Sequence, residues 1–227
     1  MLRKWEELPD FMKTEAVRPY YDILNKKKKA LMVKRVFDIV MAAFLIILLS
    51  PVMLVIAIAV KLDSKGEVFF RQERVTQYGK IFKIYKFRTM VKDADKLGSQ
   101  VTTKNDARVT RTGRFLRKYR LDETSQLFNV LSGDMSFVGT RPEVPKYVKK
   151  YTDEMYATLL LPAGVTSEAS IMYKDEEKLL VEAESADDVY VDKVLPAKMK
   201  YNLTSLQCFN LRTEMQIMVK TAFAVAN

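Results

Sequence analysis

The sequence predicts an α+β protein that is predominantly helical, with a membrane-embedded helical element near its N-terminus and a small β-hairpin after it. Three observations predict this fold class. One apolar run is too long and too weakly charged for an ordinary core helix, one pair of β-prone segments flanks a glycine-containing turn, and several segments have amphipathic helical spacing. The 227 residues, 48% of them hydrophobic, are enough for one domain with a substantial core.

The apolar run extends from Phe37 to Val60 and contains one charge, Asp38. Its 24 residues are enough to cross a bilayer, and its length and position do not fit a signal peptide. Pro51 removes a backbone hydrogen bond and predicts a sharp bend, where the Ser50 hydroxyl can bond a carbonyl that the proline frees. The two halves, roughly 20 Å and 14 Å long as helices, each reach about one leaflet deep.

Basic residues flank the run on both sides, which under the positive-inside rule favours a cytoplasmic position for both ends. A re-entrant helix-break-helix over residues 34–62 fits these features, and so does an ordinary kinked transmembrane helix. We expect residues 1–33 to lie along the membrane interface. Residues 63–227 then form a cytosolic domain that ends in an amphipathic helix over residues 211–226.

Two β-prone segments, 68–75 and 81–90, flank a turn over residues 76–80 and predict the β-hairpin. Alternation puts Lys86 and Arg88 on one face, where they can present two cations to one anion. A solvated strand end that carries two surface cations is the alternative.

Local patterns predict the remaining elements. A loop over residues 133–142 carries Arg141, whose guanidinium can fork onto a phosphate or a base. An amphipathic helix is predicted over residues 143–160, a turn over 162–166 and a solvated acidic helical face over 175–192.

Composition excludes several kinds of active site. The chain has no histidine, which excludes Ser-His-Asp and Cys-His nucleophile systems, imidazole acid–base catalysis and histidine-ligated metals. Its single cysteine, Cys208, can form neither an internal disulfide nor a zinc cage, so a reducing cytosolic environment is expected. Any chemistry therefore comes from carboxylates, hydroxyls, lysines or this cysteine.

Positive charge is concentrated around the apolar run. Lys and Arg outnumber Asp and Glu by 10 to 5 over residues 1–36 and by 17 to 6 over residues 61–121, whereas the acids lead by 16 to 11 over residues 122–227. This distribution predicts a phosphate-rich partner, which can be lipid headgroups, a nucleotide or a nucleic acid.

Two carboxylates, Asp122 and Glu123, lie at the junction of two predicted helices. Acids at a helix start have an ordinary role as N-cap and first-turn residues. Here they also lie close in sequence to Arg114 and Arg117. This setting suits an ionised carboxylate that attacks phosphorus, because the negative charges of nucleophile and diphosphate must be neutralised, by cationic side chains and by a hard cation such as Mg²⁺.

Several strings in order carry a resemblance to one family. They are KRVFDIV with Ser50-Pro51, the hairpin end YKFRTM, the string TRTGRFLRKYRLDETSQLFNVLSGDMSFVGTRP and the late PAGVT. The sequence resembles the bacterial sugar transferases, the monotopic polyprenyl-phosphate phosphoglycosyl transferases. The resemblance implies a re-entrant helix-break-helix, set by Ser50 and Pro51, joined to a compact, mostly helical catalytic domain with a small β element at the membrane surface.

The resemblance also implies the chemistry. Asp122 matches the nucleophile that takes the phosphosugar from a UDP-sugar as an acyl phosphate and releases UMP, and polyprenyl phosphate then accepts the phosphosugar. Glu123 matches a neighbour that assists proton transfer, and Mg²⁺ is expected at both carboxylates. Lys86 and Arg117 match phosphate-contacting positions, and Arg141-Pro142 match a motif for nucleotide recognition. The residues expected to contact substrate are Lys86, Arg88, Arg114, Arg117, Arg141 and Pro142.

The chain departs from the family pattern at Thr124-Ser125, at Thr140 and around Ala163. None of these positions belongs to the carboxylate pair, but the last leaves the sugar preference open. The resemblance implies the bacterial inner membrane, with the catalytic domain on the cytoplasmic face, membrane lipid as a partner and no nucleic acid; a homo-oligomer is compatible with it.

Two other classes of function compete with this reading. A membrane-anchored nucleic-acid-binding protein predicts salt-sensitive polynucleotide binding by the basic segment 61–121. A scaffold protein predicts that Asp122→Ala leaves function intact. Neither class requires the carboxylate pair and its cationic neighbours in this order.

Overall fold

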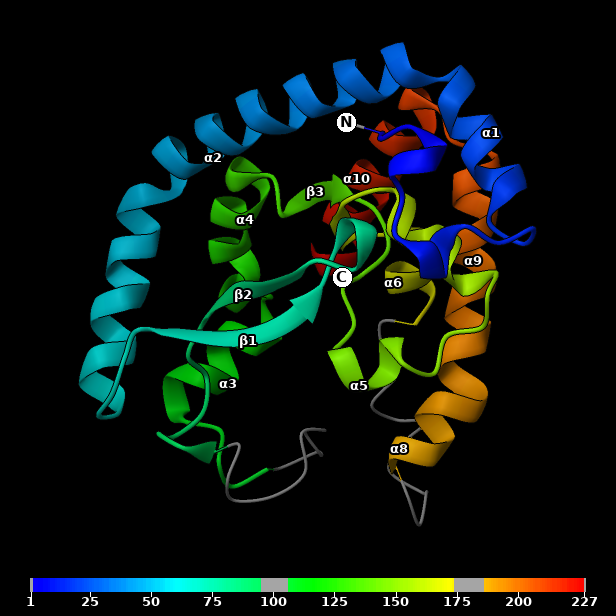
Figure 1. Ribbon diagram of the computed structural model, residues 1–227. Helices are drawn as coiled ribbons and strands as arrows, with labels where there is room; N and C mark the ends of the chain where they lie inside the picture. The colour runs from blue at the N-terminus through cyan, green and yellow to red at the C-terminus, as the bar shows by residue number, and fades with distance from the viewer. Residues whose placement is uncertain (1, 95–105, 174–185, 227) are drawn as a thin grey trace.

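A computed structural model of the protein describes residues 2–94, 106–173 and 186–226 (Figure 1). Helices make up most of these residues, and the strands form two two-stranded sheets. The fold is therefore α+β and predominantly helical, as predicted. The α-helices are α1 (Arg18–Lys26), α2 (Lys28–Asp63), α3 (Arg111–Lys118), α4 (Leu127–Ser132), α5 (Pro145–Val148), α6 (Glu168–Met172), α8 (Ala186–Val189), α9 (Leu195–Gln207) and α10 (Leu211–Ala226). Short 3-10 helices are η1 (Trp5–Glu7), η2 (Asp10–Met12), η3 (Gln77–Gly79), η5 (Leu121–Gln126) and η6 (Met155–Leu160), and η7 (Tyr190–Val194) is a π-helical turn.

The apolar run forms the middle and end of α2, which arches over α4 and β3 and then turns sharply downward (Figure 1). Pro51 lies inside this helix, and the Ser50 hydroxyl donates to the carbonyl oxygen of Ile47 at 2.8 Å. Ile47 is the residue whose carbonyl the proline leaves without its usual helical donor. The predicted bend and the predicted role of Ser50 are both confirmed. The helix begins earlier than expected, at Lys28.

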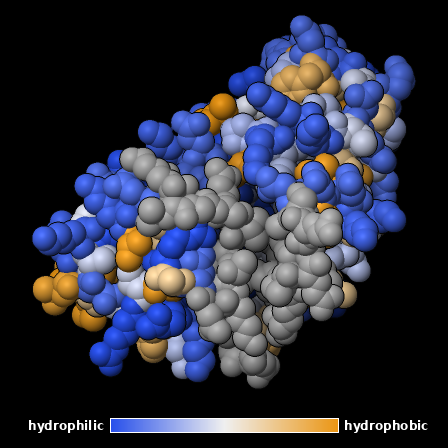
Figure 2. All heavy atoms as spheres, turned by 90° about the horizontal axis from the view of Figure 1, so that it is seen from below, coloured by the Kyte–Doolittle hydropathy of each residue, from blue (hydrophilic) through white to orange (hydrophobic). Residues whose placement is uncertain are grey.

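α2 is long and apolar enough to cross a membrane, and 17% of its most apolar 18-residue window is buried. Its exposed apolar side chains include Val40, Phe44, Ile47 and Val55. By contrast, the face seen from below in Figure 2, away from the N-terminal half of α2, is largely hydrophilic where it is described. An anchoring helix with uncovered apolar side chains indicates a membrane protein.

Hydrogen bonds of polar side chains bind the N-terminal half of α2 to the rest of the fold. Arg35 donates to the carbonyl oxygens of Val130 at 2.8 Å and Leu131 at 3.1 Å, at the C-terminal end of α4. Asp38, 2% exposed, accepts a hydrogen bond from the Ser136 hydroxyl at 2.7 Å. The single charge of the apolar run therefore faces the protein.

The predicted hairpin is present. β1 (Phe69–Val75) pairs antiparallel with β2 (Ile81–Phe87), and Val75 lies opposite Ile81. The turn between them uses left-handed backbone at Tyr78 and Gly79, with φ values of 60° and 77°.

Two predicted irregular segments contain strands instead. β3 (Met135–Val138), inside the expected loop 133–142, pairs in parallel with β4 (Ala163–Thr166), inside the expected turn 162–166. The backbones of Gly139 and Gly164 approach closely: a side chain at Gly164 would collide with the backbone of Gly139, and one at Gly139 would collide with the carbonyl oxygen of Pro162. The pairing depends on residues far apart in sequence, which local patterns do not report.

The single helix expected over residues 143–160 is also wrong. The chain there forms the short helix α5 and then η6. The consecutive residues 157–160 are all buried, whereas an amphipathic helix buries only one stripe. Of the acidic segment 175–192, residues 175–185 lie outside the described part of the chain, and residues 186–192 are helical.

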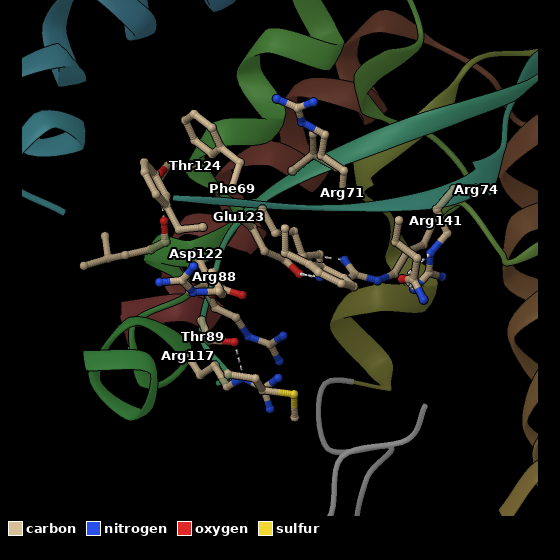
Figure 3. A pocket seen from close by; sticks show the side chains of 18 of the residues that line it. Phe69, Arg71, Arg74, Arg88, Thr89, Arg117, Asp122, Glu123, Thr124 and Arg141 are labelled. Atoms are coloured by element: carbon tan, nitrogen blue, oxygen red, sulfur yellow. Dashed lines mark hydrogen bonds and ion pairs between the residues drawn. The ribbon is translucent and has the colours of Figure 1, made fainter. Parts of the chain in front are cut away.

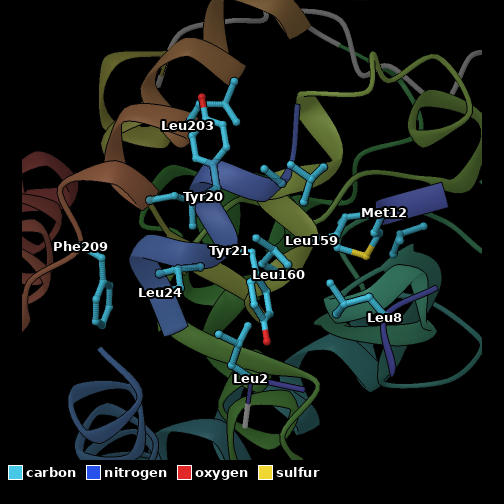
Figure 4. Close-up of a cluster of buried hydrophobic side chains, with 14 residues drawn as sticks. Leu2, Leu8, Met12, Tyr20, Tyr21, Leu24, Leu159, Leu160, Leu203 and Phe209 are labelled. Atoms are coloured by element: carbon cyan, nitrogen blue, oxygen red, sulfur yellow. The ribbon is translucent and has the colours of Figure 1, made fainter. Parts of the chain in front are cut away.

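The N-terminal segment packs onto the domain through the largest buried apolar cluster (Figure 4). Leu8 and Met12 precede α1, Tyr20 and Leu24 belong to it, and all four side chains are buried against partners that include Leu160 of η6. This segment is thus part of the core. An interfacial position for residues 1–33 stays a prediction, and these side chains are not available to lipid.

Candidate functional site

An open cleft runs beside the hairpin, α3 and η5 (Figure 3). Its lining includes seven of the residues predicted to act at the site: Lys86, Arg88, Arg114, Arg117, Asp122, Glu123 and Arg141. Residues from four separate segments of the sequence therefore meet at one place.

Polar side chains fix the carboxylate pair against the hairpin. Asn129 of α4 accepts from the backbone N–H of Tyr85 and donates to the carbonyl oxygen of Lys83, both at 2.9 Å. Ser125 of η5 donates to the carbonyl oxygen of Tyr85 at 3.0 Å. These bonds take up backbone groups of β2 that β1 does not use. They set η5 beside the C-terminal end of β2, where Lys86 lies.

Glu123 is held by two cations. Its Oε1 accepts from Lys86 Nζ at 2.8 Å and from Arg141 Nη2 at 2.6 Å (Figure 3). Burial works against the ionised form, but Arg141 and Lys86 outweigh it and hold the pKa of this carboxyl well below its usual value. Burial lowers the pKa of Lys86, and the charge of Glu123 opposes that change. Glu123 is therefore a fixed negative charge.

Asp122 has different surroundings. It is 8% exposed, and its Oδ1 is buried with no hydrogen-bond partner among the described residues. Burial raises the pKa of Asp122, Lys86 and Arg117 oppose the increase, and the neighbouring Glu123 adds to it. A carboxylate oxygen that is buried beside a cleft without a hydrogen-bond partner marks a candidate functional group, because buried polar atoms are otherwise paired.

Arg117 also belongs to this group. Its Nε donates to the Thr89 hydroxyl at 2.9 Å, which holds the guanidinium at the cleft. Gly113 permits this arrangement, because a side chain there would collide with the backbone of Thr89. The close approach of α3 to the end of the hairpin therefore brings Arg117 to the cleft.

Arg88 and Arg114 have different partners from Lys86. Arg88 lies just past the end of β2, and its Nη2 donates to the carbonyl oxygens of Ser64 at 2.6 Å and Val60 at 3.3 Å, at the end of α2. Arg114 is exposed and donates to the carbonyl oxygen of Val109 at 3.3 Å. Both line the cleft, but within the described chain Lys86 and Arg88 do not share an anionic partner.

Pro142 is buried, and its carbonyl oxygen accepts from Arg74 Nη1 at 2.9 Å. Arg74 lines the cleft and was not among the predicted site residues. Burial lowers its pKa, while Glu143 opposes the change. A position on a predicted strand does not distinguish a half-buried arginine such as Arg74 from a surface one.

Mg²⁺ binds proteins through one or two carboxylates and completes its octahedral shell with phosphates and water. Among the described residues no group of three or more His, Cys, Asp or Glu side chains converges. Asp122 Oδ1 fits such an ion, since it lacks a partner. Both oxygens of Glu123 are within reach of Arg141, so Glu123 can join only if it releases a cation.

Comparison with known proteins supplies the family. The model of the bacterial sugar transferase family matches residues 29–227. The chain is 37% identical over 193 residues to the UDP-N-acetylgalactosamine-undecaprenyl-phosphate N-acetylgalactosaminephosphotransferase of Aeromonas hydrophila, which covers 83% of this chain and 42% of that protein. It is 44% identical over 159 residues to the UDP-glucose:undecaprenyl-phosphate glucose-1-phosphate transferase of Escherichia coli (strain K12), covering 68% and 34% of the two chains.

A third relative is the undecaprenyl-phosphate galactose phosphotransferase of Salmonella typhimurium, 37% identical over 155 residues, with 62% of this chain and 32% of that protein covered. The chain thus spans less than half the length of each of these three relatives. The matched residues contain the bend of α2, the hairpin and the cleft with its carboxylate pair. The resemblance seen in the sequence is confirmed: the chain belongs to the bacterial sugar transferase family.

Proposed function

We propose that this protein transfers a sugar-1-phosphate from a UDP-sugar to undecaprenyl phosphate, giving undecaprenyl-diphosphate-sugar and UMP. The observation that carries the proposal is the contrast within the carboxylate pair. Asp122 keeps a buried oxygen that has no hydrogen-bond partner in the described part of the chain, while Glu123 binds Lys86 and Arg141. The names of the three relatives support the lipid acceptor, since each names undecaprenyl phosphate.

In the first step, an oxygen of the ionised Asp122 attacks the phosphorus that carries the sugar. A bond forms between this oxygen and phosphorus, and the bond from the same phosphorus to the bridging oxygen breaks. UMP leaves with that oxygen, and an aspartyl phosphosugar remains. The Asp122 carboxylate and the donor diphosphate repel each other. This repulsion is reduced by three cations that lie at the same cleft, Lys86, Arg117 and Arg141.

Mg²⁺ bound by Asp122 and the substrate phosphates would neutralise further charge on the diphosphate. Glu123 supports the step by holding Lys86 and Arg141 in place. Its two ion pairs favour this electrostatic role over that of a proton acceptor.

In the second step, a phosphate oxygen of undecaprenyl phosphate attacks the phosphorus of the aspartyl phosphosugar. The bond from phosphorus to Asp122 breaks, the carboxylate is regenerated, and the diphosphate bond to the lipid forms. The acceptor reaches the cleft from the membrane, and two α2 residues near the bend, Leu45 and Leu49, line the same cleft. A re-entrant α2 with both ends on the cytoplasmic face brings the cleft to the membrane surface, as its bend at Pro51 favours.

The donor sugar is the part of the reaction on which the relatives differ, because their names include N-acetylgalactosamine, glucose and galactose. The donor is therefore assigned only to the class of UDP-sugars, and assembly of a surface glycan or glycoconjugate consumes the product.

The test is UMP release by the purified protein with undecaprenyl phosphate, Mg²⁺ and a panel of UDP-sugars. Wild type is compared with Asp122→Asn, and Asp134→Asn is the control because Asp134 pairs with the exposed Lys80 away from the cleft lining. Release that requires lipid, metal and Asp122 is the expected result. Undiminished release by Asp122→Asn would remove the nucleophile assignment, and absence of release with every donor and a folded protein would contradict the reaction.

A further inference from the structure

The backbone segment that carries Arg141 makes contacts on the side of the cleft and also on the side of the C-terminal helices. Arg141 donates to Glu123 at 2.6 Å (Figure 3), and the next residue, Pro142, accepts from Arg74 at 2.9 Å. The residue after that, Glu143, is 6% exposed and turns its carboxylate toward the C-terminal helices. Three consecutive residues therefore join the carboxylate pair, the hairpin and the C-terminal part of the chain.

The carboxylate of Glu143 has two partners from that C-terminal part. Its Oε1 accepts from the hydroxyl of Tyr190 at 2.5 Å and lies 3.8 Å from Lys198 Nζ. Lys198 also donates to the Tyr190 hydroxyl at 3.3 Å, and it lies over the Tyr190 ring, 5.3 Å from the centroid. Tyr190 and Lys198 are 7% and 5% exposed. A carboxylate buried this deeply depends on such partners to be held in one position.

A local irregularity brings these two partners together. Tyr190 and Lys198 are 8 positions apart in one continuous helical run, which places their side chains about 80° apart around a regular α-helix. The π-helical turn η7 begins at Tyr190, and the N–H of Leu195 bonds to the Tyr190 carbonyl across it. One extra residue in the turn reduces the offset to about 20°. Both side chains therefore face Glu143.

We propose that Tyr190 and Lys198 are positioning residues that act through Glu143 to hold Arg141 for the donor diphosphate. Lys198 lies in the lining of the same cleft as Arg141, so this network reaches the site directly. The inference rests on the proposed function, because it assigns these residues to the binding of the UDP-sugar. It extends the site to the helical run 186–207, which contributes none of the predicted residues.

The experiment compares Tyr190→Phe and Glu143→Gln with wild type. Tyr190→Phe removes one hydroxyl, and Glu143→Gln keeps an acceptor but removes the charge that faces Lys198. The measurements are kcat and KM for the UDP-sugar, the affinity for UDP by calorimetry, and amide hydrogen exchange over residues 139–144. We expect KM and the Kd for UDP to rise about tenfold, the effect of losing one hydrogen bond to a charged group, with a smaller change in kcat and faster exchange.

The matched control is Tyr20→Phe, since the hydroxyl of the buried Tyr20 donates to Glu154 at 2.7 Å and neither residue lines the cleft. This variant should leave KM, UDP affinity and the exchange of residues 139–144 unchanged. Unchanged values for all three in a folded Tyr190→Phe protein would overturn the inference. If wild type neither releases UMP nor binds UDP, the proposed function fails, and the exchange comparison alone then decides whether Tyr190 fixes the backbone at Arg141.

Discussion

Asp122 and Glu123 are adjacent in the chain, yet only Glu123 is bound by cationic side chains. Lys86 and Arg141 lie 2.8 Å and 2.6 Å from its Oε1, whereas Asp122 Oδ1 is buried without a hydrogen-bond partner among the described residues. Neighbouring carboxylates with surroundings this different can take different roles. One is a fixed charge that organises cations, and the other is free to meet the substrate.

Replacing Glu123 by glutamine should therefore damage the site without touching the nucleophile. The change leaves the partly buried side chains of Lys86 and Arg141 without their shared anion. Removing one partner of a buried ion pair is strongly destabilising, by about 3 kcal/mol. We expect kcat/KM for UMP release to fall about 100-fold, and thermal unfolding to begin at a lower temperature.

Asp134→Asn is the matched control for that variant. It breaks an ion pair of the same length, 2.8 Å, but with the 67% exposed Lys80. Exposed pairs contribute about 0 to 1 kcal/mol, so activity and stability should stay close to wild type. Equal effects of Glu123→Gln and Asp134→Asn would show that the double ion pair at Glu123 has no special role.

Asp106 gives the protein a stability that depends on pH. Its carboxylate lies 2.6 Å from Arg108 Nη2, and hydrogen bonds from the Arg108 side chain lower the pKa of Asp106 from 3.8 to about 2. A carboxyl group whose pKa is lower in the folded state stabilises that state. This stabilisation is complete above the pKa of the unfolded chain, 3.8, and is lost as pH falls toward the folded-state pKa of about 2.

Thermal unfolding of Asp106→Asn and wild type measures this effect. The variant should unfold at a lower temperature at pH 7, and the difference should shrink as pH falls below about 4. Asp10→Asn is the control, because its ion pair with Lys13 leaves the Asp10 side chain 99% exposed. If the difference in unfolding temperature between Asp106→Asn and wild type stays constant down to acidic pH, the lowered pKa of Asp106 does not contribute to stability.

Local chemistry was enough to predict part of the fold and to point to the candidate site. Pro51 and Ser50 predict the bend of α2, because a proline breaks one known hydrogen bond whatever surrounds it. The hairpin has a local turn and two adjacent strands. Asp122 and Glu123 stand out because acids occur there among many cations.

The remaining features depend on contacts between distant residues. The β3–β4 pair brings Gly139 beside Gly164, and no pattern near either glycine reports the other. The partners of Glu143 come from helices that follow the site by many residues. Nothing local separates a buried Lys198 from a surface lysine, since its burial is decided by Glu143 and Tyr190.

A substitution of Met12 tests whether the N-terminal segment stabilises the core. Its side chain is fully buried in the cluster that also contains Leu160 of η6. Met12→Ala should lower the free energy of unfolding by about 3 kcal/mol through lost contacts and a cavity. Met172→Ala is the control, because Met172 is 58% exposed and the same change there should have little effect. Equal unfolding midpoints for the two variants in denaturant would mean that this segment does not stabilise the domain.

The bend at Pro51 is expected to return α2 to the membrane face from which it entered. In a Cys208→Ser background, which removes the single exposed thiol, one cysteine is placed at Lys29 or at Lys65, the two exposed flanks of the apolar run. A membrane-impermeant thiol reagent added to spheroplasts should label neither position. Labelling of one position in this background would instead mean that α2 crosses the membrane.

Pro51→Leu restores the backbone N–H, so the helix can straighten and its 36 residues are more than enough to cross a bilayer. One of the two cysteines should then react from outside while the other stays protected. Ser50→Ala is the milder variant: it removes the 2.8 Å bond to Ile47 but keeps the proline, so both positions should remain protected. Protection of both positions in Pro51→Leu would show that contacts such as those of Arg35 and Asp38, rather than the proline, hold the two ends of α2 on one side.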